Sequence, residues 1–155
     1  MDFRKTIKSG FKLKLFFLKN MPMGFISGMR VEEMDDAHAV VSVPFNYLTK
    51  NPFRSVYFAV QAMAAELSSG VLAMDAVMKA PRPVSMLVLE SHSYFTKKAR
   101  SKIVFTCDNG EDIRGAVKKA LETGEGQTIE VKSVGIDKEG DTVAEFSFIW
   151  TFKAK

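Results

Sequence analysis

A single carboxylate lies in the most apolar segment of the chain. Glu66 is the only charged residue between Arg54 and Asp75. Apolar or small residues surround it on every side of the segment 56–78, which predicts a helix wrapped by other structure rather than a surface helix. A carboxylate buried without a partner is destabilising and usually has a raised pKa. Two interpretations of Glu66 follow. Its side chain either reaches solvent or a salt bridge, or it acts as a general base or nucleophile at a pocket. Gln61, five residues earlier, is either a polar companion of Glu66 or an amide of the core.

Other catalytic signatures are missing from the sequence. There is no phosphate-binding GxxxxGK(S/T) loop, no dinucleotide-binding GxGxxG and no GxSxG nucleophile elbow. The two histidines, His38 and His92, and the single cysteine, Cys107, are too few and too scattered for a zinc site, so no metal is expected. A triad of His92 with Ser91 or Ser93 is excluded, because neighbouring residues of a strand point to opposite faces.

The positive charge of the chain is concentrated at its N-terminus. Residues 1–20 hold six basic residues and one acidic residue, whereas the rest of the chain holds sixteen basic and seventeen acidic residues. The body therefore lacks the dense positive face of a nucleic-acid-binding protein, and no nucleic acid is expected as a partner. The lone cysteine excludes an internal disulfide framework and suits a reducing compartment such as the cytoplasm.

The basic arm formed by residues 1–20 has apolar side chains at helical spacing with lysines between them. This pattern predicts an amphipathic helix over 3–19, interrupted near Gly10. Such an arm either packs on the body or makes peripheral contact with an anionic membrane surface. It does not resemble a secretory signal, because Lys14 breaks its apolar run and no small-residue cleavage site follows. The segment 56–78 is not expected to span a membrane, because its carboxylates would be costly in lipid.

The rest of the chain divides into strands and helices of one domain, residues 1–155. The expected elements are strands at 28–34 and 37–45, a helix of about 20 residues from near Ser55, strands at 86–95 and 102–107, a helix at 111–122, and strands at 128–136 and 142–152. Runs of strands on either side of one buried helix favour the α+β class over a doubly wound sheet.

Two of these strands have faces that can be assigned by period-two alternation. The strand 142–152 aligns five apolar residues on one side, from Ala144 to Phe152, which predicts a heavily buried face. In the strand 86–95, unbroken alternation places Met86 and Val88 on the same face as His92 and Tyr94.

The start of the apolar helix resembles a known motif. The stretch Asn51–Glu66 is similar to the central-helix motif of hotdog-fold thioesterases of the phenylacetate-pathway type, which reads roughly Asn-Pro-x-Gly-x-x-His-Gly-Gly-Ala and is followed by a catalytic Asp or Glu. Asn51 and Glu66 coincide with its opening residue and its carboxylate. Tyr57 stands where the family has His, and Phe58 and Ala59 replace Gly-Gly. The order of elements over residues 25–152 is also similar to that of an uncharacterised branch of the same superfamily.

The resemblance implies a hotdog fold, with an antiparallel sheet around a long central helix and two further helices, and a homodimer or a tetramer. It also implies an acyl-CoA thioesterase whose acyl slot lies between subunits, with Glu66 of one chain facing the helix start of the other. The backbone N–H groups of Phe58 and Ala59 would stabilise the oxyanion, with Asn51 at the same site. A non-catalytic protein that binds a fatty-acyl ligand is the alternative.

The remaining site residues are expected to bind substrate. Tyr57 and Gln61 are two of them, and Ser85 lies near the position of the Ser or Thr that the family carries on the following strand. Lys97, Lys98 and Arg100 are candidates for the phosphates of coenzyme A, or form a solvated charged turn. No cofactor is expected beyond the coenzyme A of the substrate.

Overall fold

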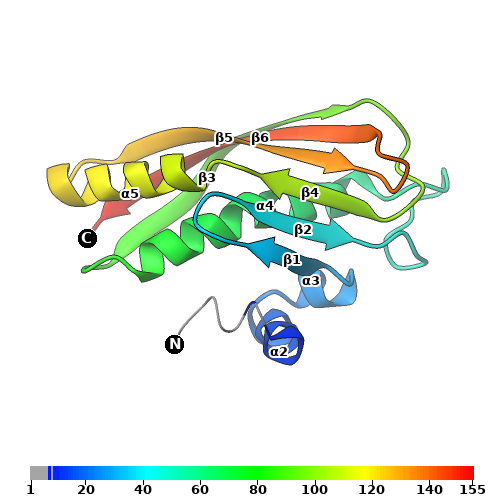
Figure 1. The fold of residues 1–155 in the computed structure, drawn as a ribbon, viewed down its shortest axis with the longest axis horizontal. Helices are drawn as coiled ribbons and strands as arrows, with labels where there is room; N and C mark the ends of the chain where they lie inside the picture. The colour runs from blue at the N-terminus through cyan, green and yellow to red at the C-terminus, as the bar shows by residue number, and fades with distance from the viewer. Residues whose placement is uncertain (1–6, 8) are drawn as a thin grey trace.

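The computed structural model describes residue 7 and residues 9–155. Its elements are α2 (Gly10–Asn20), α3 (Pro22–Ile26), β1 (Arg30–Met34), β2 (Ala39–Val43), α4 (Phe58–Met78), β3 (Val84–Phe95), β4 (Ile103–Cys107), α5 (Gly110–Thr123), β5 (Gln127–Ile136) and β6 (Thr142–Ala154). The strands form a six-stranded antiparallel sheet in the order β1-β2-β4-β5-β6-β3, and α4 runs beneath it (Figure 1). The predicted architecture of one sheet packed on one long central helix is confirmed, and β1 and β3 are its two edges.

Buried serines attach α4 to the sheet. The hydroxyl of Ser68 lies 2.8 Å from that of Ser133 on β5, and the indole N–H of Trp150 on β6 donates to the hydroxyl of Ser69 at 3.0 Å. All four side chains are buried, so each pairing satisfies polar groups that would otherwise lose their hydrogen bonds to water. These contacts fix which side of α4 faces the sheet.

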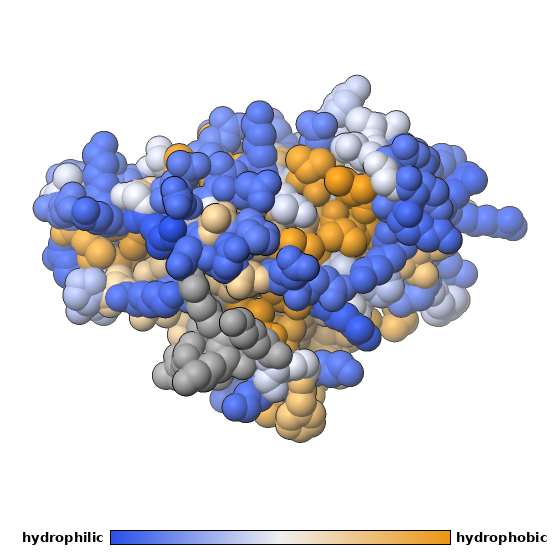
Figure 2. Space-filling view, viewed as in Figure 1, coloured by the Kyte–Doolittle hydropathy of each residue, from blue (hydrophilic) through white to orange (hydrophobic). Residues whose placement is uncertain are grey.

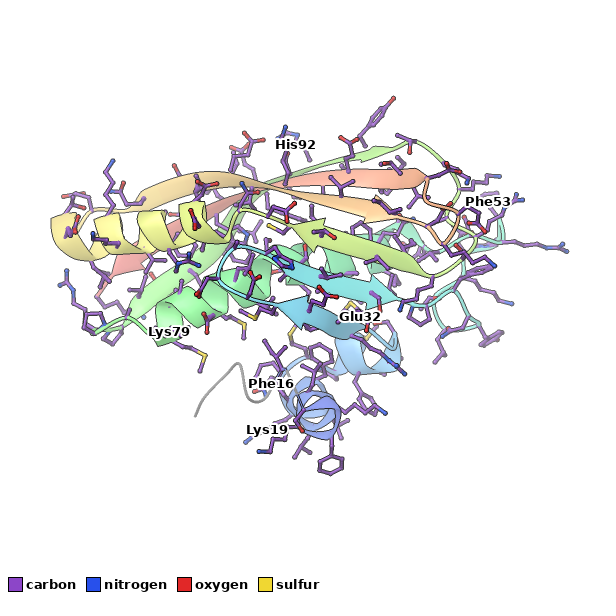
Figure 3. All side chains as sticks on the ribbon, in the orientation of Figure 1. Phe16, Lys19, Glu32, Phe53, Lys79 and His92 are labelled. Atoms are coloured by element: carbon purple, nitrogen blue, oxygen red, sulfur yellow. The ribbon has the colours of Figure 1, made fainter. Side chains whose placement is uncertain are left out.

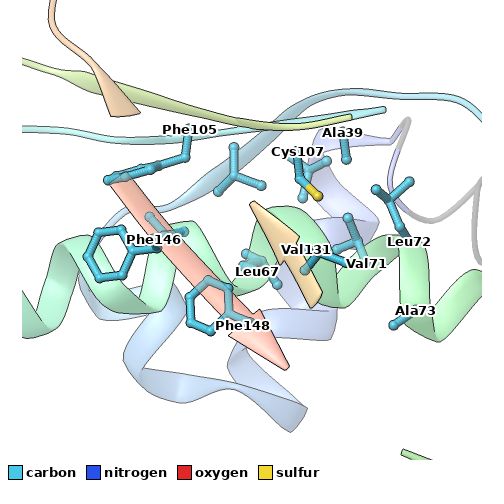
Figure 4. Close-up of a cluster of buried hydrophobic side chains, with 14 of the residues drawn as sticks. Ala39, Leu67, Val71, Leu72, Ala73, Phe105, Cys107, Val131, Phe146 and Phe148 are labelled. Atoms are coloured by element: carbon cyan, nitrogen blue, oxygen red, sulfur yellow. The ribbon is translucent and has the colours of Figure 1, made fainter. Parts of the chain in front are cut away.

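Aromatic and aliphatic side chains fill the space between α4 and the sheet (Figure 4). Leu67 and Val71 of α4 belong to the same buried cluster as Phe105 of β4 and Phe146 and Phe148 of β6. The alternating residues of β6 from Ala144 to Phe152 are buried as the sequence predicted. The core therefore lies on one side of the sheet, which is its α4 side.

The edge strand β3 contains a bulge that changes its faces. The pairing of β3 with β6 shifts between Val88 and Glu90, so Leu89 is an extra residue in the ladder. Before the bulge, Val88 pairs with Trp150; after it, Ser91 pairs with Phe148. Directly paired residues share a face, so Ser91 continues the α4 side of the sheet. The predicted unbroken alternation from 86 to 95 is wrong, because the extra residue inverts the order of faces.

The N-terminal segment adds one helix that the sequence did not predict. Ser9 caps α2 by accepting a hydrogen bond from the N–H of Lys12 at 3.4 Å, which agrees with the expected interruption near Gly10. The short helix α3 follows at once, with Pro22 in its first turn. The earlier part of the predicted helix, residues 3–6 and 8, lies outside the described residues. No helix in the described part of the chain is long and apolar enough to cross a membrane.

Candidate functional site

The loop before α4 is shaped by one amide side chain. Asn51 Oδ1 accepts hydrogen bonds from the N–H of Phe53 at 3.0 Å and from the N–H and hydroxyl of Ser55 at 3.2 Å each. Arg54, at the position where the hotdog motif has glycine, adopts a left-handed φ of 58°. Asn51 therefore acts through the shape of this loop, since three donors already occupy its carbonyl oxygen.

The first turn of α4 presents two free backbone N–H groups. Val56 N–H donates to the carbonyl of Ala99 at 2.8 Å, and the N–H of Tyr57 is held by the preceding loop. The helix consequently begins at Phe58, three residues later than predicted. The N–H groups of Phe58 and Ala59 have no acceptor among the described residues, as is usual for the first turn of a helix. They lie at the positive end of the helix dipole and can stabilise an oxyanion.

Glu66 lies on the side of α4 that faces away from the sheet. It precedes the sheet-facing Ser68 by two residues, which is about 200° around the helix. Its carboxylate is half-buried and has no hydrogen-bond or ion-pair partner within the described part of the chain. A Cβ atom on Gly70 would lie 3.0 Å from Glu66 Oε1, so the glycine one turn later leaves room for the carboxylate. Burial raises the pKa of Glu66.

One chain alone cannot bring Glu66 and the free amides to one reacting carbonyl. Ala59 precedes Glu66 by seven residues, and both lie on the outer side of α4. At a rise of about 1.5 Å per residue, they are roughly 10 Å apart along the helix axis. A carbonyl held within hydrogen-bond distance of the amide would therefore be out of reach of the carboxylate of the same chain.

A hollow of about 490 Å³ lies at the start of α4, between the loop 51–57 and the segment 95–99. It brings together six of the site residues predicted from the sequence: Asn51, Tyr57, Phe58, Gln61, Lys97 and Lys98. Gln61, only 5% exposed, donates through Nε2 to the carbonyl of Val56 at 3.0 Å, while its Oε1 has no hydrogen-bond partner among the residues that the structure describes. A buried carbonyl oxygen without a donor is destabilising, so the hollow offers an acceptor to an N–H or O–H of a ligand.

A row of aromatic rings leads from this hollow into the core. Ring centroids are 5.0 Å apart for Tyr57 and Phe58, 6.5 Å for Phe58 and Phe95, and 5.6 Å for Phe95 and Phe146. The first three side chains are exposed, whereas Phe146 is buried. Exposed aromatic rings at the helix start form an apolar surface for an acyl chain or for a second protein surface.

The edge strand β3 adds two hydroxyls that sequence reasoning missed. Ser91 and Ser93 lie on the α4 side of the sheet, paired with Phe148 and Phe146, and both are exposed. The side on which Ser91 and Ser93 lie follows only from the position of the bulge, because unbroken alternation assigns both serines to the opposite face. Ser85, the predicted match, lies at the far end of β3, where its hydroxyl donates to the carbonyl of Lys153 at 3.2 Å. At about 3.3 Å per residue it is roughly 30 Å from the end of β3 that lines the hollow.

The basic residues after β3 differ in what they contact. Lys97 Nζ bonds to Asp137 Oδ2 at 2.9 Å and to Asp141 Oδ2 at 2.5 Å, and these carboxylates raise the pKa of Lys97. Lys98 lies against the exposed ring of Phe53, 5.9 Å from its centroid, near the end of the molecule (Figure 3). Arg100 is exposed and lies outside the hollow. Lys98 is therefore better placed than Lys97 to bind an anionic ligand at this end of β3.

Lys97→Met should lower the Tm, because the ammonium group of Lys97 holds the turn 137–141, and it should not weaken binding of coenzyme A, the ligand that the motif resemblance implies. Lys98→Met should show the reverse pattern, a several-fold higher Kd for coenzyme A with an unchanged Tm. Thermal denaturation and isothermal titration calorimetry on both variants measure the two effects. Equal weakening of coenzyme A binding by the two substitutions would contradict this division of roles.

The ion pairs of Lys97 with Asp137 and Asp141 make a pH-dependent contribution to the stability of the fold. The ammonium group of Lys97 and two backbone N–H groups lower the pKa of Asp137 below its ordinary value. A carboxyl whose pKa is lower in the folded protein stabilises it above the ordinary Asp pKa, and this stability is lost as the pH falls through the lowered pKa. Lys97→Met should therefore reduce the loss of stability in acid, as measured by urea denaturation across that range.

Other reactive side chains lie outside this region. Cys107 is buried, and burial raises the pKa of its thiol to about 11, so the thiol stays protonated near neutral pH. His38 pairs with Asp35 at 3.0 Å. His92 lies 3.6 Å from Glu90 and points away from α4 (Figure 3). No group of three or more metal-binding side chains occurs among the residues the structure describes.

Solved structures with the same fold come from several bacteria. A Pseudomonas aeruginosa protein of unknown function, described as a probable thioesterase, superposes with a TM-score of 0.80 at 21% identity, over 95% of this chain and 97% of its own. A Chlorobaculum tepidum protein of unknown function superposes with a TM-score of 0.78 at 14% identity, over 93% of each chain. A Haemophilus influenzae thioesterase gives a TM-score of 0.61 at 11% identity, over 90% of this chain and 88% of its own. These likenesses confirm the expected hotdog fold.

Sequence comparison places the chain in a family. A search of curated protein sequences found no match. The family described as Domain of unknown function (DUF4442) matches residues 12–152, which include the whole sheet up to Phe152, the helix α4 and the hollow at its start. The chain therefore belongs to the DUF4442 family.

Proposed function

We propose that this protein hydrolyses acyl-CoA thioesters as a homodimer, with Glu66 as the catalytic carboxylate. The observation that carries the proposal is the position of Glu66, a half-buried carboxylate on the outer side of the central helix that has no partner in the described part of the chain and has a raised pKa. A raised pKa brings a carboxylate closer to the basicity that a general base needs near neutral pH. Structural neighbours described as thioesterases support the same reaction class.

The reaction needs a base, an oxyanion site and a path for the leaving group. Glu66 removes a proton from water as the water oxygen attacks the thioester carbonyl carbon. The N–H groups of Phe58 and Ala59 stabilise the negative charge on the carbonyl oxygen. When the tetrahedral intermediate collapses, the carbon–sulfur bond breaks, and the proton held by Glu66 passes to the departing sulfur. The products are a carboxylic acid and the free thiol of coenzyme A.

The homodimer supplies the geometry that one chain lacks. If two copies of α4 lie side by side and antiparallel, with the two-fold axis passing between Ala62 and Met63, Glu66 of one protomer lies opposite Ala59 of its partner. The outer side of α4 permits a close approach, because Ala59, Ala62 and Gly70 on it are small. The exposed edge of β3 can pair with its own copy in the same arrangement. A dimer therefore forms two equivalent sites.

The hollow at the start of α4 is the proposed substrate site. Its aromatic residues would contact the acyl chain, and Oε1 of Gln61 would accept a hydrogen bond from an amide N–H of the substrate. Lys98, which lines the hollow, and the exposed Arg100 two residues later would bind the phosphates of coenzyme A. The reducing compartment suggested by the lone cysteine, the cytoplasm, agrees with such a substrate.

Gln61→Met should raise the KM for acyl-CoA by roughly tenfold with little change in kcat, since a lost hydrogen bond to a buried acceptor is worth about 1–2 kcal/mol. The substitution keeps the length and flexibility of the side chain and removes the acceptor. Steady-state kinetics measure the effect, and Gln127→Met on β5, outside the hollow, is the matched control. An unchanged KM would show that Gln61 does not contact the substrate.

The experiment that tests the function is hydrolysis of a panel of acyl-CoA thioesters of different chain length and ring content. Release of the coenzyme A thiol is followed by a thiol-reactive dye, and binding of the same thioesters is measured in parallel. Hydrolysis of at least one class well above the uncatalysed rate is expected. Tight binding of every thioester that is tested, without release of thiol, would instead show a non-catalytic acyl-binding protein.

A further inference from the structure

Helix α2 has a second apolar side, and this side is exposed. Leu13 and Phe17 are buried against the body of the protein, and Phe16 lies between α2 and the rest of the molecule (Figure 3). The large side chains of Phe11 and Leu15 are nevertheless 79% and 56% exposed, and Leu18 is 54% exposed. Exposed residues at spacings of four and three form one stripe along a helix.

Lysines lie on both sides of this stripe. At about 100° per residue, Phe11, Leu15 and Leu18 fall within an arc of roughly 60°, on the side of α2 opposite Leu13. Lys14 lies on one flank of the stripe, and Lys12 and Lys19 lie on the other. Residues 9–20 contain no acidic residue. The exposed side of α2 therefore combines an apolar centre with cationic margins.

We infer that α2 lies on anionic lipid surfaces, with Phe11, Leu15 and Leu18 inserted between the headgroups. The axis of a surface-bound helix lies in the plane of the interface, with its apolar stripe inward and its lysine stems reaching out to phosphates. The arrangement on α2 meets these requirements. A second copy of α2 fits the stripe less well, because antiparallel pairing would bring rows of lysines together.

The position of α2 in the molecule agrees with such contact. It projects from the body beside β1, at the opposite edge of the sheet from β3, and forms the lower tip of the molecule (Figures 1 and 2). Apolar and hydrophilic side chains lie next to one another at this tip (Figure 2). The adjoining helix α3 adds three exposed apolar side chains, Met23, Phe25 and Ile26. Lipid contact through α2 would leave β3 and the start of α4 free, so it does not depend on the proposed enzymatic function.

The test is sedimentation of the full chain with phospholipid vesicles. Binding to vesicles of 30% phosphatidylglycerol in phosphatidylcholine is expected at low salt, with weaker binding to phosphatidylcholine alone and a loss in 0.5 M sodium chloride. Phe11→Ser/Leu15→Ser/Leu18→Ser should reduce binding at least about tenfold. Leu48→Ser/Ile136→Ser, which removes exposed apolar side chains elsewhere, should bind as the wild type does.

Three results of the sedimentation experiments would overturn the inference. These are equal binding to charged and uncharged vesicles, undiminished binding by the triple variant, and a smaller molecular mass of the triple variant in solution, which would reveal a second copy on the stripe. Leu15→Trp provides a readout that does not depend on the stability of the triple variant. Its fluorescence should shift to shorter wavelength on addition of anionic vesicles, and an unshifted spectrum would equally overturn lipid insertion.

Discussion

Glu66→Gln should lower the kcat for acyl-CoA hydrolysis by about 10²–10⁴, the usual contribution of a positioned general base, and change the KM only a few-fold. Glutamine keeps the size of the side chain and its place on α4 but cannot accept a proton from water. Because Glu66 has no partner within the described residues, its replacement leaves no other charge unpaired. The loss of rate would therefore report the chemistry of the carboxylate rather than damage to the fold.

Glu130→Gln makes the same chemical change on β5, where the side chain is exposed, and should hydrolyse thioesters at the wild-type rate. Both variants are compared with wild type on the substrate that gives the highest rate in the acyl-CoA panel. If Glu66→Gln and Glu130→Gln retain the same activity, Glu66 is not the catalyst. An equally low rate of hydrolysis for both variants would indicate a general loss of activity that does not depend on Glu66.

The same substitution should stabilise the folded protein at neutral pH. Burial raises the pKa of Glu66, so in the folded state the group binds its proton more tightly than in the unfolded state. Its contribution to stability is fully present below the ordinary Glu pKa and is lost as the pH rises through the raised pKa. Glu66→Gln removes that decline. Urea denaturation of both proteins at pH values spanning this window should show their stabilities diverging as the pH rises.

The apolar patterns in the sequence were sufficient to predict the fold. Apolar residues on all sides of 56–78 predicted a helix wrapped by other elements, and the alternation from Ala144 to Phe152 predicted a buried strand. Both patterns reflect burial, because every position of an element that faces the core must hold an apolar or small residue. The bulge at Leu89 could not be predicted in this way, because it depends on the pairing of β3 with β6 rather than on the composition of either strand.

The candidate site was predictable only in part, because the roles of several of its residues depend on contacts with distant segments of the chain. Glu66 was conspicuous because a charge in an apolar segment violates the pattern around it. Lys97 matched the expected basic cluster equally well, but its ammonium group is bonded to carboxylates some forty residues later in the chain. The sequence excludes Ser91 and Ser93 as members of a triad with His92, and it does not indicate that both lie on the α4 side of the sheet. Contacts between distant segments decide such roles.

The replacement of Gly-Gly by Phe58 and Ala59 changes the helix start without removing its donors. Both residues retain their N–H groups, which point out of the first turn. The ring of Phe58 packs edge-on against Phe95 and so occupies space that glycine would leave open. The proposed site is therefore narrower and more aromatic than the motif it resembles, which favours substrates that can lie against rings.

Ser91→Lys/Ser93→Lys should convert the protein to a monomer and reduce hydrolysis by at least about 10², the value of oxyanion donors that the partner would no longer supply. Every residue from Leu89 to Phe95 is exposed, and β3 contains none of the lysines or prolines by which edge strands usually prevent pairing. Two lysines on its α4 side would face their own copies across the proposed interface. Their like charges would oppose association.

Sedimentation equilibrium measures the mass, which is expected to fall from twice the 17.3 kDa of one chain to that value. Thr128→Lys/Glu130→Lys, with the same spacing on exposed positions of β5, should remain dimeric and active. Both serines are exposed in the single chain, so lysine at these positions should leave its folding intact. A wild-type protein that sediments as a monomer, or a monomeric variant that hydrolyses thioesters at full rate, would contradict the shared site. The second result would mean that one chain holds both the base and the oxyanion donors, although about 10 Å of helix separates them.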